Sequence, residues 1–229
     1  MKRLVIIAAG LGVALPAAVS AQDDGGAWNV EARIGAVSDY RFRGLSLSGG
    51  DPALQAGATL SHASGFYTDV YLSSIEEYGA GDDGDGSELE VTLTGGWAGS
   101  WLGLDWDAAL SAYRYPGGDE VDYVEAPVQV SRAFGPVTTT FGVAFAPEQR
   151  ALGDEDNRYV WTSVDYAPES WSVSLTASIG YEDGAWAPDG KTDWRVGGFM
   201  PVGVLTAGLE WIDSDVDKGA LVASVFASF

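Results

Sequence analysis

The feature that most constrains this chain is a strict alternation of apolar and polar side chains that begins at Trp28. Even positions are mainly apolar or aromatic as far as Phe42, and odd positions are mainly polar or charged as far as Arg43, with breaks at Val37 and Ser38. A period of two residues places the two kinds of side chain on opposite faces of a β-strand. The run is longer than the roughly 5 to 6 residues of an average strand. We therefore predict one long strand with an apolar face.

The same alternation recurs along the rest of the chain, and no segment has a convincing helical period. We therefore predict an all-β protein with about 12 strands, whose ends are uncertain by about two to four residues. The further predicted strands are Leu54 to Leu60, Phe66 to Ser74, Leu89 to Trp97, Trp101 to Tyr115, Tyr123 to Arg132, Val137 to Phe145, Arg158 to Tyr166, Trp171 to Tyr181, Asp193 to Met200, Val204 to Trp211 and Ala220 to Phe229.

The connections between these strands are predicted to alternate strictly between short turns and longer acidic loops. Short turns such as "HASG" at 62–65 lie between longer loops such as "EEYGAGDDGDGS" and "EDGAWAPDGK". Such an alternation is typical of an up-and-down barrel of the outer membrane, whose extracellular loops are the longer ones. Closing the sheet also removes the edge strands that a flat meander would expose. The predicted fold is a closed antiparallel transmembrane β-barrel.

Aromatic residues support a barrel that spans a bilayer, because they gather near the two ends of the predicted strands and leave smaller apolar residues between them. Trp106 and Phe141 break this arrangement, and the alternation places Trp161 on the inward face. The aromatic residues near the long loops are Tyr40, Phe42, Phe145, Tyr181, Trp194 and Trp211, and those near the short turns are Trp28, Phe66, Trp97, Trp171 and Phe229.

The first residues predict export. Lys2 and Arg3 precede an apolar run from Leu4 to Leu15, and small residues follow as far as Ala21. This is the pattern of a secretory signal peptide cut after Ala21, and the apolar run is too short to span a bilayer as a helix. The expected organisation is a signal peptide at 1–21 and one barrel domain at 22–229, located in the cell outer membrane.

Composition excludes several classes of function. The chain holds 33 acidic and 12 basic residues, so a nucleic-acid partner is not expected. It has no cysteine, so no disulfide scaffold holds it together. We find no phosphate-binding loop, nucleotide fingerprint or Cys/His metal cluster, and we expect no cofactor and no resident metal.

A resemblance to a known family appears in the stretch from Val37 to Ser74. The segments "SDYRFRG" at 38–44, "PALQ" at 52–55 and "SHASGFY" at 61–67 resemble, in order and spacing, the opening of the TorF family of porin-like proteobacterial proteins, which is also classed as a domain of unknown function. Ala56 replaces the glycine of that pattern. The resemblance is specific over about forty residues and architectural afterwards. It implies an outer-membrane barrel and brings no established substrate.

The predicted alternation assigns a set of charged side chains to the barrel lumen. An arginine strip from Arg33 to Arg43 would face carboxylates across a narrow lumen that favours cations. Alternatively, these charges pair with one another and fill a lumen that does not conduct. The set comprises Glu31, Arg33, Asp39, Arg41, Arg43, Asp69, Glu88, Glu90, Asp105, Asp107, Glu125, Asp165, Asp193, Arg195 and Glu210.

Two tighter motifs allow other chemistry. His62 and Ser64 have the His-x-Ser spacing of outer-membrane phospholipases, which would place a base beside a hydroxyl, but a tight turn explains the same residues. The acidic loops "DDGDGSE" at 82–88 and "DSDVDKG" at 213–219 carry carboxylates at alternate positions, as calcium loops do, but neither completes the twelve-residue pattern with a glycine at position six and a glutamate at position twelve. We favour a turn in the first case and solvated loops in the second, although weak bridging of lipopolysaccharide phosphates by divalent cations stays open.

The sequence thus predicts an outer-membrane porin through which small hydrophilic solutes diffuse passively, without catalysis. The alternative is a structural or adhesion-type barrel that does not conduct. The expected partners are outer-membrane lipid, lipopolysaccharide, the solutes and the outer-membrane assembly machinery, which would recognise the strand that ends in Phe229. The oligomeric state is not predicted.

Overall fold

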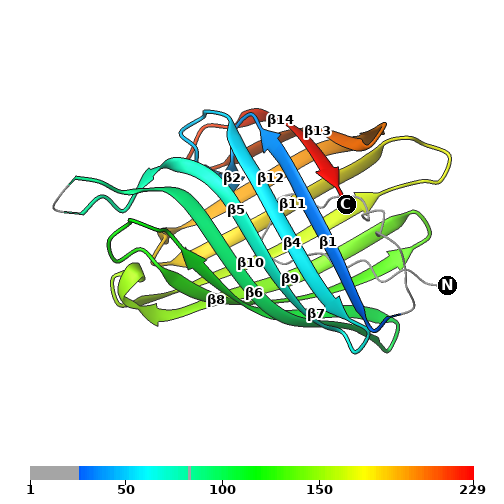
Figure 1. The fold of residues 1–229 in the computed structure, drawn as a ribbon, viewed down its shortest axis with the longest axis horizontal. Helices are drawn as coiled ribbons and strands as arrows, with labels where there is room; N and C mark the ends of the chain where they lie inside the picture. Colours follow the sequence, from blue (N-terminus) through cyan, green and yellow to red (C-terminus); the bar gives the residue numbers. More distant parts are fainter. Residues whose placement is uncertain (1–25, 82–83) are drawn as a thin grey trace.

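The computed structural model describes residues 26–81 and 84–229, and it shows a closed antiparallel barrel of 12 strands (Figure 1). This confirms the predicted fold class. The predicted signal peptide at 1–21 lies outside the described residues. The barrel strands are β1 (Trp28–Val37), β4 (Ala53–His62), β5 (Phe66–Tyr78), β6 (Ser87–Trp101), β7 (Leu104–Arg114), β8 (Tyr123–Phe134), β9 (Val137–Gln149), β10 (Glu155–Tyr166), β11 (Ser174–Gly184), β12 (Ala187–Val202), β13 (Leu205–Ser214) and β14 (Ala220–Ser228).

The barrel closes because β1 pairs with β4 on one side and with β14 on the other. The pairing with β4 runs from Trp28 opposite His62 to Val37 opposite Ala53, and the pairing with β14 runs from Arg33 opposite Ser228 to Val37 opposite Ser224. Every barrel strand therefore has two hydrogen-bonded neighbours. The backbone groups of the wall are satisfied without an open edge.

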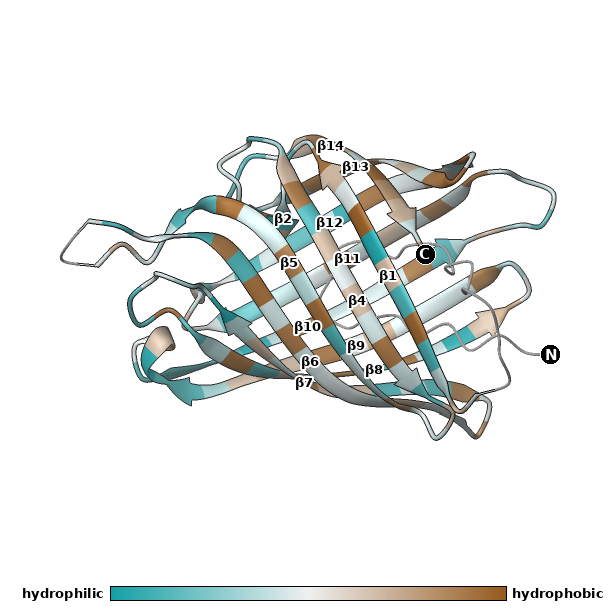
Figure 2. Ribbon diagram, viewed as in Figure 1, coloured by the Kyte–Doolittle hydropathy of each residue, from teal (hydrophilic) through white to brown (hydrophobic). Residues whose placement is uncertain are grey.

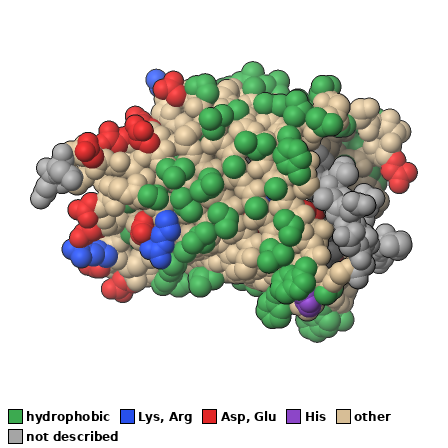
Figure 3. Space-filling model, in the orientation of Figure 1, with side chains coloured by type: hydrophobic (Ala, Val, Ile, Leu, Met, Phe, Trp, Pro, Cys, Tyr) green, Lys and Arg blue, Asp and Glu red, His purple; other side chains and the backbone are tan. Residues whose placement is uncertain are grey.

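The two faces of the wall differ in chemistry. Hydropathy alternates residue by residue along the strands, and apolar side chains cover the side of the barrel, while charged side chains gather toward one end (Figures 2 and 3). On β6, Leu93 is exposed whereas its neighbour Thr92 is buried in the interior. Large apolar side chains exposed on the outside include Val30, Ile34, Leu60, Val70, Leu93, Leu110, Val128, Phe141, Val160, Ile179, Val196, Leu209 and Val225.

The predicted alternation of short and long connections is wrong at two places. Two residues, Ala185 and Trp186, join β11 to β12, because the strands continue through the stretch 182–191 that was predicted as a loop. At the opposite end, the predicted short turn between β10 and β11 spans residues 167–173. Gly184, Pro188 and Gly190 led to a predicted loop in the first stretch, and the alternation of Trp171 and Val173 with serine led to an early strand start in the second. The end of the barrel that holds the β1–β4, β5–β6 and β7–β8 connections is called the loop end below.

The predicted first strand is also wrong in its second half. β1 ends at Val37, and residues 41–46 form a separate hairpin of two short strands, β2 (Arg41–Phe42) and β3 (Leu45–Ser46). Tyr40, predicted to lie in a lipid-facing girdle, is buried and packs with Val37 and Tyr71. The breaks in the alternation at Val37 and Ser38 mark the point where the chain leaves the wall.

Glycines make room for aromatic rings inside the barrel. Trp161 projects inward, as the alternation predicted, and lies against Gly142, where a Cβ atom would stand 2.1 Å from the indole ring. Tyr159 lies in the same way against Gly180 on the neighbouring strand, and the rings of Tyr159 and Trp161 are stacked 5.5 Å apart. The wall can therefore hold large rings flat against its inner surface.

Candidate functional site

The hairpin of residues 41–46 is the central feature of the loop end. Its two-residue turn consists of Arg43 and Gly44, both with positive φ angles of 49° and 83°. Such a turn matches the twist of a hairpin and favours glycine at its second position. At Gly44 a Cβ atom would also stand 2.7 Å from the Cβ of Ser214 and 2.9 Å from the Cβ of Asp193. The hairpin tip therefore lies directly against β12 and β13.

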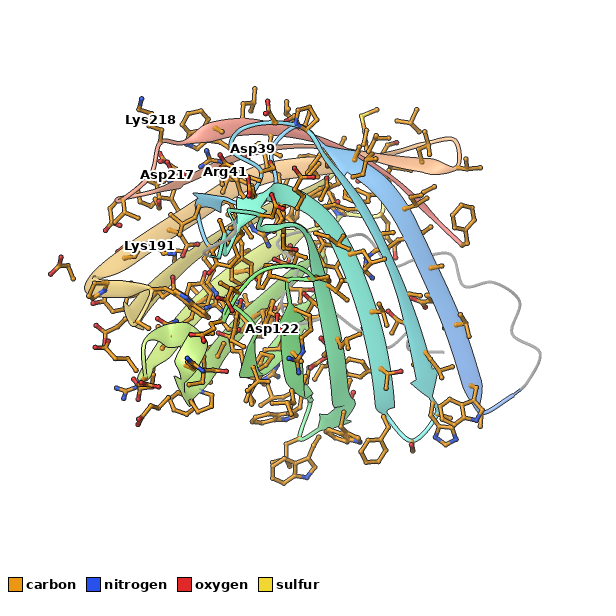
Figure 4. All side chains as sticks on the ribbon, turned by 60° about the vertical axis from the view of Figure 1, so that its left-hand side comes forward. Asp39, Arg41, Asp122, Lys191, Asp217 and Lys218 are labelled. Carbon is orange, nitrogen blue, oxygen red and sulfur yellow. The ribbon has the colours of Figure 1, made fainter. Side chains whose placement is uncertain are left out.

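Polar contacts fix the base of the hairpin. Arg41 pairs with Asp39 at 2.6 Å and with Asp217 at 3.6 Å. The hydroxyl of Ser46 donates to Asp39 at 2.6 Å, and its backbone N–H donates to Asp217 at 3.3 Å. Figure 4 shows Asp39, Arg41 and Asp217 gathered at one end of the barrel. The loop at 213–219, considered above as a calcium loop, thus holds the hairpin.

Arg43 extends from the hairpin tip to two strands of the barrel wall, β8 and β11. Its Nη2 donates to Glu125 on β8 at 2.6 Å, and its Nη1 donates to Glu182 on β11 at 2.8 Å. The guanidinium also lies over the ring of Tyr159 on β10, 4.2 Å from the centroid. The exposed fraction of these charged side chains is 7% for Arg43 and 2% for each glutamate. Burial by itself lowers the pKa of Arg43. The carboxylates of Glu125 and Glu182 more than offset that effect and hold the pKa above its usual value.

Glu182 is shared among three donors. Lys191 on β12 pairs with its Oε2 at 2.5 Å, and Asn157 on β10 donates to its Oε1 at 3.0 Å. Lys191 has an exposed side-chain fraction of 3%. A buried charge is stable only when it is paired and hydrogen-bonded. Strands β8, β10, β11 and β12 are therefore joined to the hairpin by one continuous set of ion pairs and polar contacts around Arg43.

Glu90, a second buried carboxylate near the hairpin, has only hydroxyl donors among the described residues. Glu90 on β6 accepts from Tyr40 at 3.0 Å, from Thr92 at 3.2 Å and from Tyr115 at 3.2 Å. Burial and the nearby Glu90 raise the pKa of Tyr40, so its phenol stays protonated and donates. Tyr40 lies directly before the hairpin, so this contact joins the hairpin to the far side of the lumen.

Aromatic side chains pack around the hairpin at the loop end. The rings of Tyr113 and Tyr123 are stacked 4.4 Å apart, Trp186 meets Tyr123 edge-on at 4.6 Å, and Phe42 lies 6.1 Å from Tyr113. Tyr115 belongs to the same cluster. The loop end of the lumen is thus filled by aromatic rings and by the hairpin.

The remainder of the lumen is polar and carries further carboxylates. Arg33 pairs with Asp69 at 3.2 Å, and Tyr67 donates to Asp107 at 2.9 Å. Arg195 donates to Ser178 at 3.1 Å and lies 4.0 Å from Glu210. Within residues 26–81 and 84–229, one carboxylate oxygen each of Glu125, Asp69, Asp107 and Asp193 is buried without a hydrogen-bond partner.

The structure does not place all the residues that were predicted to line the lumen on its wall. Asp39, Arg41 and Arg43 belong to the inward loop and not to a strand. Glu88 is exposed at the loop end, because the β5–β6 pairing is irregular between Ser74 and Tyr78 and shifts the alternation there. Asp105 faces the opposite mouth, is exposed and accepts a hydrogen bond from Ser100. The inward wall positions hold Glu31, Arg33, Asp69, Glu90, Asp107, Glu125, Asp165, Asp193, Arg195 and Glu210.

Sequence reasoning missed several residues of the cluster around Arg43. Glu182 and Lys191 fell within a predicted loop, because Gly184, Pro188 and Gly190 interrupt the stretch. Alternation did continue on the β11 side, where Gly180 and Glu182 face inward and Tyr181 faces outward. That continuation was the signal for Glu182. Tyr40 was assigned to the lipid side because its position was read as part of β1.

His62 and Ser64 form a compact turn at the end opposite the loop end. Nδ1 of His62 lies 2.7 Å from the Ser64 hydroxyl and accepts from the Ser64 backbone N–H at 3.2 Å. The imidazole also packs beside Trp28, with ring centroids 4.5 Å apart. A backbone N–H donating to Nδ1 is the geometry of a side chain that stabilises a turn.

The acidic loops were also considered as cation sites. Asp82 and Asp83 of the first loop lie outside the described residues. Among the residues that are described, no group of three or more His, Cys, Asp or Glu side chains is placed to hold a metal ion. Where the chain is described, it also holds no helix long and apolar enough to cross a membrane.

A sequence profile described as "Bacterial protein of unknown function (Gcw_chp)" matches residues 21–227. The chain belongs to this family. A comparison with curated protein sequences gives no match for this Gcw_chp protein.

Solved structures share the fold of this Gcw_chp protein. A KdgM porin in complex with disordered oligogalacturonate has a TM-score of 0.57 at 7% identity, covering 87% of this chain and 97% of the porin. A NanC porin has a TM-score of 0.53 at 10% identity, with the same two coverages. At such low identity the likeness extends to the porin-type barrel fold alone.

Proposed function

We propose that this Gcw_chp protein is a porin-type channel of the outer membrane through which small hydrophilic solutes diffuse, with a lumen that favours cations. The observation that carries the proposal is the difference in polarity between the outer and the inner face of the barrel wall. The outside is apolar, and the inside holds carboxylates that exceed their cationic partners among the described residues. A polar interior within an apolar wall is the arrangement of a water-filled barrel in lipid.

The outer face supports a location in lipid. Exposed apolar side chains such as Ile34, Leu93 and Val196 cover the middle of the wall, each more than 40% exposed. A soluble protein rarely exposes an apolar patch larger than a few hundred Å². Trp28, Phe66 and Trp171 are exposed near the end opposite the loops and would lie at the membrane interface. Outer-membrane lipid and lipopolysaccharide are therefore the proposed surroundings.

The preference for cations follows from the unpartnered carboxylate oxygens. The free oxygens of Asp69, Asp107 and Asp193 face the lumen from three different strands. A ring of carboxylates in a narrow pore attracts cations and repels anions. The substrate stays open, and the TorF name suggested by the opening residues belongs to this proposal, since the matching family is described only as of unknown function.

A second candidate is a barrel with a structural or adhesive role and no conductance. The observation that favours it is the filled loop end, where the hairpin and the aromatic cluster pack against one another. We favour the channel because the hairpin touches the walls mainly through charged and polar side chains of a separate loop. Such a loop can move without breaking the pairing of the barrel strands. Catalysis by His62 and Ser64 forms no part of the proposal.

Swelling of liposomes tests the proposal. Protein refolded into liposomes, and shown to be folded by its heat-modifiable gel mobility, is diluted into isosmotic arabinose or lysine hydrochloride. We expect faster swelling than in protein-free liposomes, and in a matched run in sodium glutamate the anionic glutamate should enter more slowly than the cationic lysine, which is of similar size. Swelling no faster than in protein-free liposomes would support the structural barrel and contradict the channel.

A further inference from the structure

The guanidinium of Arg43 lies in a recognition site that the barrel wall forms by itself. Glu125 on β8, Glu182 on β11 and Tyr159 on β10 supply two carboxylates and one aromatic face. Arg43 alone comes from outside the wall, on the tip of the hairpin. Carboxylates that accept from separate nitrogens and an aromatic ring face beneath the charge are contacts that a guanidinium group favours.

Two of the three wall residues, Glu182 and Tyr159, are held in place by partners other than Arg43. Glu182 is bound by Lys191 and Asn157. The hydroxyl of Tyr159 donates to Asp193 at 3.1 Å, and its ring lies against Gly180 and beside Trp161. The β10 and β11 side of the site would therefore keep its shape if the hairpin moved away, because these contacts run among the barrel strands β10, β11 and β12.

The charge of the site requires a cation. Without Arg43, Glu182 would keep Lys191 as its only described cationic partner within 4.0 Å, and Glu125 would have none among the described residues. Oε1 of Glu125 is buried and has no hydrogen-bond partner in the described residues even with Arg43 in place. The site thus offers one acceptor more than Arg43 uses, which a larger ligand with additional N–H groups would fill.

We infer that Glu125, Glu182 and Tyr159 form a binding site for solutes that carry a guanidinium group, and that Arg43 occupies it as an internal substitute for such a solute. The inference deepens the proposed function, on which its transport consequence rests. A guanidinium solute that enters the lumen competes with Arg43 and releases the hairpin tip. A tethered group competes at an effective concentration on the order of mM, so displacement needs solute concentrations of about that size or more.

The test removes Arg43 and supplies the guanidinium from solution. In Arg43→Asn the turn becomes Asn-Gly, which is strongly favoured at these positive φ angles. Methylguanidinium is titrated into the refolded full chain in detergent by calorimetry at constant ionic strength. We expect saturable binding at one site per chain, and weaker binding by about tenfold or more when Glu182→Gln or Glu125→Gln is added, because each change removes a charge-assisted hydrogen bond.

Two control ligands and one control variant make the test specific. Methylurea has a similar planar shape without the charge, and methylammonium has the charge without the plane, so both should bind at least about tenfold more weakly. Arg150→Gly removes an exposed arginine that pairs with Glu120 and keeps Arg43 in the site, so it should bind methylguanidinium at least about tenfold more weakly than Arg43→Asn does. If Arg43→Asn does not refold, Arg43→Gly serves, because glycine also accepts the positive φ angle.

The results separate this inference from the proposed function. The inference is overturned if folded Arg43→Asn shows no saturable binding, or if binding is unchanged by Glu182→Gln. In planar bilayers, methylguanidinium should raise the open fraction of the wild-type channel more than methylammonium does at equal concentration, and equal effects would contradict the displacement of Arg43. Binding to the variant without any conductance of the wild type would leave the site standing and remove the channel.

Discussion

At the scale of single residues, the loop end depends on how buried charges are shared. Glu182 is the residue on which this sharing converges, because it accepts from Arg43, Lys191 and Asn157 at once. Arg43 retains Glu125 as a partner if Glu182 is lost. Lys191 has no other carboxylate within 4.0 Å among the described residues. Glu182 is therefore expected to matter more for stability than any exposed carboxylate.

The first prediction compares Glu182→Gln with Glu88→Gln. Glu182→Gln leaves the buried ammonium of Lys191 without its counter-charge, and breaking a buried pair from one side costs about 3 to 5 kcal/mol. Glu88 is exposed at the same end of the barrel, so its change should stay within about 0.5 kcal/mol. Urea titration of the folded, heat-modifiable gel band measures both. Equal unfolding midpoints would show that the cluster around Glu182 is not formed as described.

At the scale of elements, the sequence was sufficient for the wall and insufficient for what lies inside it. The alternation from Trp28 to Val37 depends only on which solvent each face meets, so a local pattern reveals it. The hairpin depends on contacts between residues far apart in the chain, such as Arg43 with Glu182 and Ser46 with Asp217. No local pattern carries that information. Arg41 and Arg43 were thus predicted to face the lumen from the first wall strand. That strand, β1, ends at Val37, and both arginines belong to the hairpin that follows it.

The second prediction tests the two faces of one strand. Leu93 faces outward and Thr92 faces inward on β6, where its hydroxyl donates to Glu90. Leu93→Lys places a charge in lipid and should destabilise the barrel by about 2 to 4 kcal/mol near mid-membrane. Thr92→Lys places the ammonium beside Glu90, so a much smaller loss is expected. The comparison uses urea unfolding in lipid vesicles, and similar losses at both positions would mean that the faces are wrongly assigned.

The third prediction concerns the hairpin as a unit. The backbone N–H of Leu47 donates to the carbonyl of Tyr40 at 2.7 Å, so residues 41–46 can be replaced by Gly-Gly, a sequence that suits a two-residue turn. The shortened loop should close without strain, and the loop end of the lumen should open. We expect a larger single-channel conductance than in the wild type. An unchanged conductance in a folded variant would mean that the hairpin does not narrow the conducting path.

At the scale of the whole molecule, the protein combines a closed barrel, an apolar outer wall and an acidic lumen. The 12-stranded closure and the two faces follow from patterns that extend along the whole chain, which is why the fold class was predictable. The arrangement of the lumen was not, because Arg43 and Tyr40 act through contacts with strands far away in the sequence, at Glu125, Glu182 and Glu90. The match to a family of bacterial proteins of unknown function agrees with a barrel whose cargo the sequence does not reveal.

A zero-current potential shows whether the lumen conducts and whether its carboxylates favour cations. Refolded wild-type protein is inserted into a planar bilayer between concentrated and dilute KCl. We expect discrete conductance steps and a zero-current potential that is positive on the dilute side, because K⁺ crosses faster than Cl⁻. A potential that is negative on the dilute side would contradict the cation preference. The absence of steps from protein shown to be folded and inserted would contradict the channel itself.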